Sequence, residues 1–194
     1  MKKELFLSDY YKKSSSCISS LQKESGNIIK AVNLILTTLK RNKTILVAGN
    51  GGSFSDAEHF VCELSCTFKD KRRGLSAISL GSNASSITAW SNDFGFETYF
   101  SRQVEALGKS KDVLFLISTG GNPKGSLSSL NLSHALRAAK KKKMKVISLV
   151  GKNGGRLKKE SDICIHVKSN ETSTVQEAHI TILHSICGLI DQNV

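Results

Sequence analysis

The sequence predicts an α/β protein with three layers, in which helices cover both faces of a central five-stranded parallel sheet. Several short, β-branched and almost unbroken apolar runs are typical of strands buried on both faces of a parallel sheet. Helical stretches separate these runs, which favours right-handed βαβ crossovers. Two of the runs lead into glycine-rich turns, where ligands of such folds collect.

The chain is expected to form a single domain over residues 1–194, because no proline- or serine-rich linker divides it. Residues 1–41 should be N-terminal helices, since their apolar residues recur every three or four positions, with a break near Gly26. Residues 42–194 should be the α/β core, ending in a terminal helix.

The five expected strands are Thr44–Ala48, Leu75–Leu80, Asp112–Ser118, Lys145–Val150 and Ile163–Val167. Helices are expected at Ser53–Phe68, Ala84–Ala89, Glu97–Ala106, Gly125–Lys142, near Leu157 and, as an apolar terminal helix, at Thr174–Ile190.

The net charge of +12 raises the question of a nucleic-acid partner. Much of it comes from Lys140–Lys143 and Lys145, where a helix should end and its dipole favours cations. Only 6% of the residues are aromatic and none lies in this run, so we expect no nucleic-acid partner.

No apolar segment has the length of a signal peptide or a membrane span, so we expect a soluble protein with no membrane contact. The five cysteines are odd in number and irregularly spaced, which is typical of reduced thiols. Both features favour a cytoplasmic location.

A strand, a glycine-rich turn and a helix follow one another in Ile45–Leu64. The turn Gly49–Ser53 should present backbone N–H groups to an anion, and Ser53 is placed to cap the helix. The turn is not a Walker loop or a dinucleotide fingerprint, because no Gly-Lys-Ser/Thr follows and Phe54 replaces the third glycine. A tight connection alone would also explain the glycines.

A second turn, Ser118–Ser126, again combines hydroxyls, glycines and a helix start. Two such turns after two parallel strands favour an anionic ligand. Because hydroxyls and backbone amides are present instead of a P-loop lysine, the pattern indicates a phosphate that is held as a handle on a sugar.

Two helices carry side chains suited to acid–base or metal chemistry. His59 and Glu63 are four residues apart on one helix face, and Gln176 and His184 share a stripe of the terminal helix. Together they offer two imidazoles, a carboxylate and an amide oxygen, a set that suits zinc with an exchangeable position.

Simpler interpretations exist for both helices. A histidine such as His184 in an apolar helix is more often a core residue than a ligand. Cys62 and Cys66 are a rival pair of metal ligands, although a buried helix face would explain them more simply.

The segments GNGGSFSDAEHFVCEL, NDFGF, STGGN and VQEAHITILH, in this order and spacing, resemble the sugar isomerase (SIS) domain family and, within it, the phosphoheptose isomerases. The resemblance covers nearly the whole chain and implies a flavodoxin-like SIS fold. It implies conversion of sedoheptulose 7-phosphate to D-glycero-D-manno-heptose 7-phosphate for lipopolysaccharide or capsule. It also implies a homotetramer with one zinc per subunit, in active sites at subunit interfaces.

Carried over position by position, the resemblance makes Glu63 the catalytic base and His184 its acid partner. The implied zinc ligands are His59, Glu63, Gln176 and His184. The implied substrate-binding residues are Asn50, Gly51, Gly52, Ser53, Glu63, Asn92, Asp93, Ser118, Thr119, Gly120 and Gln176. Such groups suit aldose–ketose exchange, in which a base moves a proton between C1 and C2 through an enediol while an acid or metal stabilises the oxygens.

The chain departs from the family pattern at the expected phosphate end. Gly120 and Pro123 replace two hydroxyl residues, and Thr67 and Thr174 stand where the family commonly has arginines. The loss of two cations weakens the binding of a dianion, so an isomerase or sensor of another sugar phosphate is one alternative.

A non-catalytic SIS-domain partner of the replication initiator is the other alternative. Proteins of that branch resemble phosphoheptose isomerases that have lost the glutamate and the final histidine, whereas this chain keeps Glu63 and His184.

Overall fold

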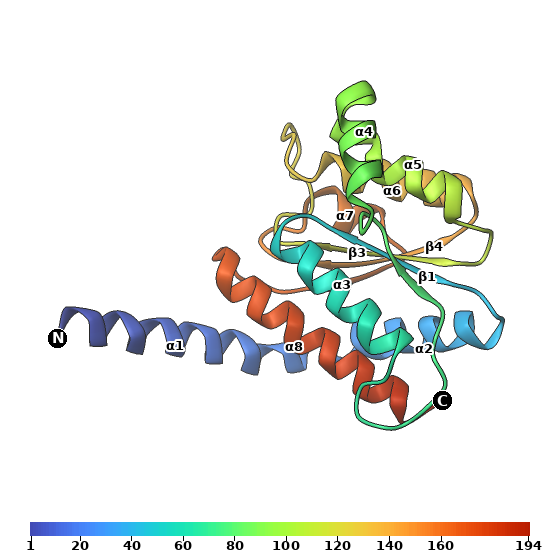
Figure 1. Cartoon of the computed structure of the whole chain (residues 1–194). Helices are drawn as coiled ribbons and strands as arrows, with labels where there is room; N and C mark the ends of the chain where they lie inside the picture. The colour runs from blue at the N-terminus through green and yellow to red at the C-terminus, as the bar shows by residue number, and fades with distance from the viewer.

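The computed structural model describes residues 1–194 and confirms an α/β fold around a five-stranded parallel sheet (Figure 1). The strands are β1 (Ile45–Gly49), β2 (Ala77–Ser79), β3 (Val113–Ser118), β4 (Lys145–Val150) and β5 (Ile163–His166). Their order is β2-β1-β3-β4-β5, and every neighbouring pair is parallel. This is the flavodoxin order, in which a ligand crevice opens between the carboxyl ends of β1 and β3.

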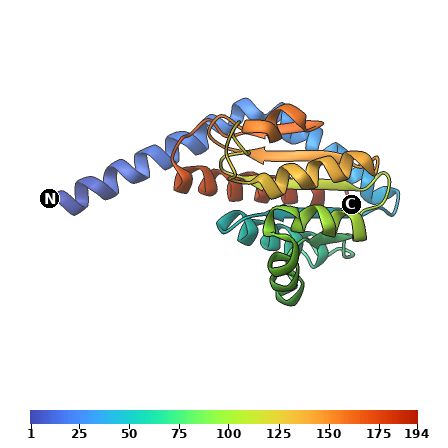
Figure 2. The ribbon, with the colours of Figure 1, turned by 90° about the horizontal axis from the view of Figure 1, so that it is seen from above.

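The helices are α1 (Lys2–Ser20), α2 (Ser25–Lys40), α3 (Gly52–Ser65), α4 (Ala84–Phe94), α5 (Tyr99–Leu107), α6 (Leu130–Lys141), α7 (Gly155–Glu160) and α8 (Thr172–Asp191), with short 3₁₀ turns η1 (Leu21–Glu24) and η2 (Phe96–Thr98). Much of α1 projects from the body of the molecule (Figures 1 and 2). None of these helices has both the length and the apolar character that crossing a membrane requires.

Two hydrophobic cores lie on opposite faces of the sheet. Helices α2, α3 and α8 pack on one face, and α5, α6 and α7 pack on the other. Successive residues of β1 alternate between the cores, with Ile45 and Val47 in the first and Leu46 and Ala48 in the second. Because β1 and β3 are adjacent and parallel, the two glycine-rich turns that follow them lie side by side at the carboxyl ends of the strands.

Several expected bounds differ from the structure. Helix α3 ends at Ser65 instead of Phe68, and α4 continues to Phe94 instead of ending at Ala89. The second strand is shorter than Leu75–Leu80 and is half-buried, because β2 is an edge strand with a partner on one side only. The helix expected from Gly125 begins at Leu130, since Gly125 (φ +78°) and Ser129 (φ +58°) have left-handed backbone conformations that cannot belong to the helix. The expected break between the N-terminal helices is confirmed, since η1 lies just before Gly26.

All five cysteines are free, as expected. The expectation that Cys62 and Cys66 form a buried helix face was wrong, because both are exposed. The buried residues of α3 are Ser53, Ala57, Phe60 and Leu64, a different stripe of the same helix.

Candidate active site

The first ligand turn connects β1 to α3 and is crowded at Gly49 and Gly52. A Cβ atom at Gly49 would lie 2.2 Å from the backbone oxygen of Ser53. Gly51 is the N-cap of α3, with φ +53° and ψ −125°, and no side chain caps the helix. The expected cap by Ser53 was wrong, because the helix begins one residue earlier, at Gly52, and Ser53 is already inside its first turn.

The amide of Gln176 on α8 lies directly against this turn. A Cβ atom at Gly52 would come within 2.1 Å of Gln176 Nε2, so a glycine here lets α8 approach α3. The structure thereby brings together two predicted site residues that are far apart in the sequence.

His59, Glu63 and His184 meet where α3 and α8 pack together. His59 Nε2 and Glu63 Oε1 are 3.0 Å apart, and the Glu63 side chain is 19% exposed. The rings of His59 and His184 have centroids 5.2 Å apart and planes at 70°. No hydrogen bond joins Glu63 directly to His184, so the contacts run from the carboxylate to His59 and on to His184.

Asp56 lies one turn before His59 on α3. Burial raises the pKa of Asp56 to about 6, although the nearby His59 favours the charged form. One carboxyl oxygen of Asp56 is buried without a hydrogen bond. Helix α3, which carries His59 and Glu63, thus also holds a carboxyl whose pKa lies above that of an ordinary aspartate.

The second ligand turn follows β3 and is organised by Ser118. This side chain is buried, and its hydroxyl accepts hydrogen bonds from the N–H groups of Gly120 (3.4 Å) and Gly121 (3.0 Å) and contacts the Ser129 hydroxyl at 3.0 Å. Ser118 therefore holds the turn in place from its buried side, whereas Thr119 and Gly120 are half-exposed.

Two asparagines connect the first turn to α6. The Asn50 amide nitrogen donates to Asn131 Oδ1 at 2.9 Å, and the Asn131 amide nitrogen donates to Asn50 Oδ1 at 2.8 Å. A cavity of about 410 Å³ opens beside this pair, lined by Asn50, Phe96, Glu97, Leu127, Ser129, Leu130 and Asn131. Sequence reasoning missed Asn131, because nothing in the local pattern of α6 indicates that one of its residues reaches the turn after β1.

Asn92 and Asp93 do not join these groups within one chain. Both are exposed near the end of α4, where the Asn92 amide donates to the Asp93 carboxylate at 2.8 Å. Helix α4 packs on η2 and α5, on the other face of the sheet from α3 and α8 (Figure 1).

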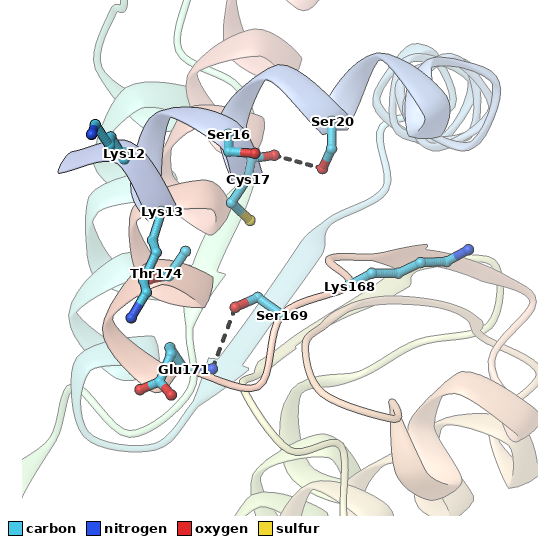
Figure 3. Close-up of a pocket in the computed structure, with 9 residues that line it drawn as sticks. All are labelled: Lys12, Lys13, Ser16, Cys17, Ser20, Lys168, Ser169, Glu171 and Thr174. Carbon is cyan, nitrogen blue, oxygen red and sulfur yellow. Dashed lines mark hydrogen bonds between the residues drawn. The ribbon is translucent and has the colours of Figure 1, made fainter. Parts of the chain in front are cut away.

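A cavity of about 660 Å³ lies elsewhere, between α1 and the segment that leads into α8 (Figure 3). Its lining is Lys12, Lys13, Ser16, Cys17, Ser20, Lys168, Ser169, Glu171 and Thr174. The Lys12 and Lys168 side chains point away from its centre, so the lysines do not converge on one point (Figure 3). Of the positions singled out in the sequence, only Thr174 lies on its wall.

Three of the four predicted zinc ligands, His59, Glu63 and His184, supply donor types that zinc commonly takes, and Gln176 adds an amide oxygen. Within the chain, however, no three His, Cys, Asp or Glu side chains form a ready-made metal-binding group. Because Glu63 is hydrogen-bonded to His59, a metal ion here would replace that contact with its own bonds to the two side chains.

The comparison with known proteins assigns the class first. A family model described as "SIS domain" matches residues 9–151. A phosphoheptose isomerase of Helicobacter pylori (strain P12) is 44% identical over 174 residues, which are 90% of this chain and 88% of the relative. Phosphoheptose isomerase 1 of Campylobacter jejuni is 45% identical over 168 residues, which are 87% of each chain.

A solved structure of a phosphoheptose isomerase from Francisella tularensis superposes with a TM-score of 0.92 at 33% identity, covering 100% of both chains. The chain therefore belongs to the phosphoheptose isomerase family of SIS-domain proteins.

Proposed function

We propose that this protein is an aldose–ketose isomerase that converts sedoheptulose 7-phosphate to D-glycero-D-manno-heptose 7-phosphate through an enediol, a step towards lipopolysaccharide or capsule heptose. Relatives named phosphoheptose isomerase that align with about nine-tenths of the chain support the activity. The observation that carries the assignment of the site is the meeting of His59 and Glu63 on α3 with His184 on α8.

Glu63 is the base in this proposal. Its ionised carboxylate takes a proton from C1 of the ketose and, once protonated, returns a proton to C2. The hydrogen bond from His59 fixes the orientation of the carboxylate in this structure, a role that bonds of both side chains to zinc would take over, and the low exposure of Glu63 limits competing water. His184 is the acid partner, which gives a proton to the C2 oxygen and accepts one from the C1 hydroxyl as the aldehyde forms.

The phosphate is held at the carboxyl ends of β1 and β3. Thr119 and Gly120 contact it from the turn that Ser118 shapes, and Asn50, Gly51, Gly52 and Ser53 line the sugar side together with Gln176. Pro123 has no N–H to offer, so the second turn holds the phosphate with fewer donors than the family pattern has.

Zinc is the proposed cofactor, one ion per subunit, held by His59, Glu63, Gln176 and His184. When bound, it would act as a Lewis acid towards the sugar oxygens. The donor set and the adjacency of α3 and α8 support this proposal.

We propose a homotetramer in the cytoplasm. The projecting helix α1 leaves Leu5, Phe6 and Tyr11 65%, 67% and 62% exposed, which favours their burial against another subunit. Asn92 and Asp93 lie away from the other site residues, which fits a contribution to a neighbouring subunit's site.

The test is to incubate the purified protein with sedoheptulose 7-phosphate and follow the aldose by NMR, with wild type, Glu63→Gln and a chelator-treated sample in parallel. Turnover by wild type that Glu63→Gln loses supports the proposal. No turnover, or equal turnover by the two proteins, contradicts it. Other sugar phosphates in the same assay test the alternative that Thr67 and Thr174 raise, and a pull-down with the replication initiator tests the non-catalytic one.

A further inference from the structure

The segment between α3 and β2, residues 66–76, is here called the strap. In Figure 1 it leaves the end of α3, passes the C-terminal end of α8 and returns to the sheet. It has no regular secondary structure along most of its length, yet specific polar contacts fix it at both helices.

The strap is anchored to α8 through Asp191, the last residue of that helix. Asp191 Oδ1 accepts from Arg72 Nε at 2.7 Å, and Oδ2 accepts from the backbone N–H groups of Lys69 (2.9 Å) and Asp70 (3.2 Å). The Arg72 and Asp191 side chains are only 6% and 2% exposed. Burial alone would raise the pKa of Asp191, but these hydrogen bonds and the guanidinium charge hold it below its ordinary value.

The same guanidinium caps the C-terminus of α3. Arg72 Nη2 donates to the backbone oxygen of Glu63 at 2.6 Å, and Nη1 donates to that of Leu64 at 2.9 Å. The last carbonyls of a helix lack partners within the helix, so these bonds hold the turn that carries Glu63. Arg72 thus joins the ends of the two helices that supply the proposed base and acid.

The strap also contacts His184 directly. The Phe68 ring stacks on the His184 imidazole, with centroids 5.5 Å apart and planes at 24°. Phe68 precedes Lys69, whose N–H is bound to Asp191, so the anchor that holds the strap also holds this ring.

The return of the strap requires Gly74. A Cβ atom there would lie 2.6 Å from the backbone oxygen of Ser65, at the end of α3. The chain therefore passes close enough to α3 for Leu75 to donate its N–H to the Leu64 oxygen at 3.0 Å.

We propose that the strap sets the relative position of Glu63 and His184, with Arg72, Asp191 and Phe68 as positioning residues that do not touch the substrate. This rests on the proposed roles of Glu63 and His184. The two ligand turns, at Gly49–Ser53 and Ser118–Gly121, lie outside the strap, and Thr67, the strap position at the expected phosphate end, carries no cation that would bind a phosphate. Loosening the strap should therefore slow proton transfer while leaving substrate binding nearly unchanged.

The kinetic test uses the full-length protein with Arg72→Lys, Asp191→Asn, Phe68→Leu and Phe68→Tyr. Arg72→Lys keeps the charge but loses the planar fork of donors. We expect Arg72→Lys, Asp191→Asn and Phe68→Leu to lower kcat by about 10- to 100-fold with KM within about twofold, the size that misplacement by about an ångström causes. Phe68→Tyr, which keeps the stacked ring, should retain most of the wild-type kcat.

The matched control is Asp162→Asn. Asp162 precedes β5 and accepts hydrogen bonds from Lys145 Nζ (2.7 Å) and from the N–H of Val146 (2.9 Å) on β4, so its hydrogen bonds involve neither the strap nor the ends of α3 and α8. It should lower thermal stability and leave kcat unchanged per folded molecule. If the strap variants behave like this control, or if they raise KM with kcat intact, the proposal is overturned. Should Asp191→Asn fail to fold, the Phe68 pair decides.

A second readout does not depend on turnover. A stacked aromatic ring shifts the proton resonances of the imidazole it covers, and the His184 signals can be assigned by their loss in His184→Gln. Phe68→Leu and Arg72→Lys should both move the His184 resonances, while Phe68→Tyr should leave them near the wild-type position. Unmoved resonances in both would overturn the proposal even in an active enzyme. Moved resonances without turnover by wild type would instead count against the proposed function.

Discussion

Replacing His179 with leucine should make the protein much less sensitive to acid. His179 lies on α8 with no exposed surface, and neither ring nitrogen has a hydrogen-bond partner. Burial lowers the pKa of His179 to about 4 from an ordinary 6.5, an effect that the Val150 backbone, near the ring but outside hydrogen-bond geometry, offsets only in part. A neutral imidazole is therefore built into the folded core.

The sign and size of the effect follow from this pKa. The folded protein binds the proton less readily than the unfolded chain, so the stability that neutral His179 contributes is complete above pH 6.5 and is lost as the pH falls towards 4. At about 1.4 kcal/mol per pKa unit, the difference amounts to about 3 kcal/mol of unfolding free energy. Leucine has no proton to bind, and its volume suits the site.

Urea unfolding at a series of pH values from about 7 to about 4 measures the unfolding free energy of each protein. All samples are kept at one protein concentration, because subunit association would add to the stability. Wild type should lose about 3 kcal/mol more than His179→Leu over this range, since the carboxyl groups titrate alike in both proteins. His179→Gln, polar but without a titrating group, should follow the leucine variant. A constant difference between wild type and His179→Leu at all pH values would refute the reasoning.

Three further predictions concern the site. In Gly52→Ala the new Cβ atom would lie 2.1 Å from Gln176 Nε2 and should displace that amide, which lowers kcat/KM about tenfold with an unchanged melting temperature. The control is Gly26→Ala, whose Cβ atom would have nothing within 4 Å and should leave the kinetics unaltered. Asn131→Ala should leave the Asn50 amide without its hydrogen-bond partner, so the unfolding free energy should fall by about 1–3 kcal/mol and KM should rise. Unchanged stability and an unchanged KM would contradict the role of this asparagine pair. Adding zinc at about a hundred times its Kd to chelator-treated wild type should raise the unfolding free energy by about 3 kcal/mol. His59→Ala should show no such gain, and an equal gain in both proteins would argue against the proposed ligands.

The buried part of the fold could be predicted from the sequence because its signal is local. The run Lys145–Val150 is a strand with the same bounds in the structure, and β3 differs from its prediction by one residue. The edge strand β2 is shorter than its apolar run, since only one neighbour pairs with it. The start of α6 was predicted too early, because the left-handed backbone at Ser129 is not encoded by a glycine.

The candidate site was predictable where two residues share one helix, as His59 and Glu63 do. The contacts between α3 and α8 depend on tertiary packing and leave no local pattern. Arg72 and Asp191 are 119 residues apart, and no pattern in the sequence indicates that their side chains are buried together. The roles of Glu63, His184 and the zinc ligands stay predictions that experiment must test.

The fate of the transferred proton tests the central claim, that Glu63 moves a proton between C1 and C2 through an enediol beside His184. The isomerisation is run in D₂O, and the aldose product is examined by NMR for deuterium at C2. The account predicts deuterium at C2 in the wild-type product and neither product nor exchange with folded Glu63→Gln. Because Glu63 is 19% exposed, its protonated carboxyl can exchange with solvent during repeated forward and reverse turnovers. A wild-type product that carries only protium at C2 after such prolonged turnover would indicate direct hydrogen transfer between the carbons and would contradict the account.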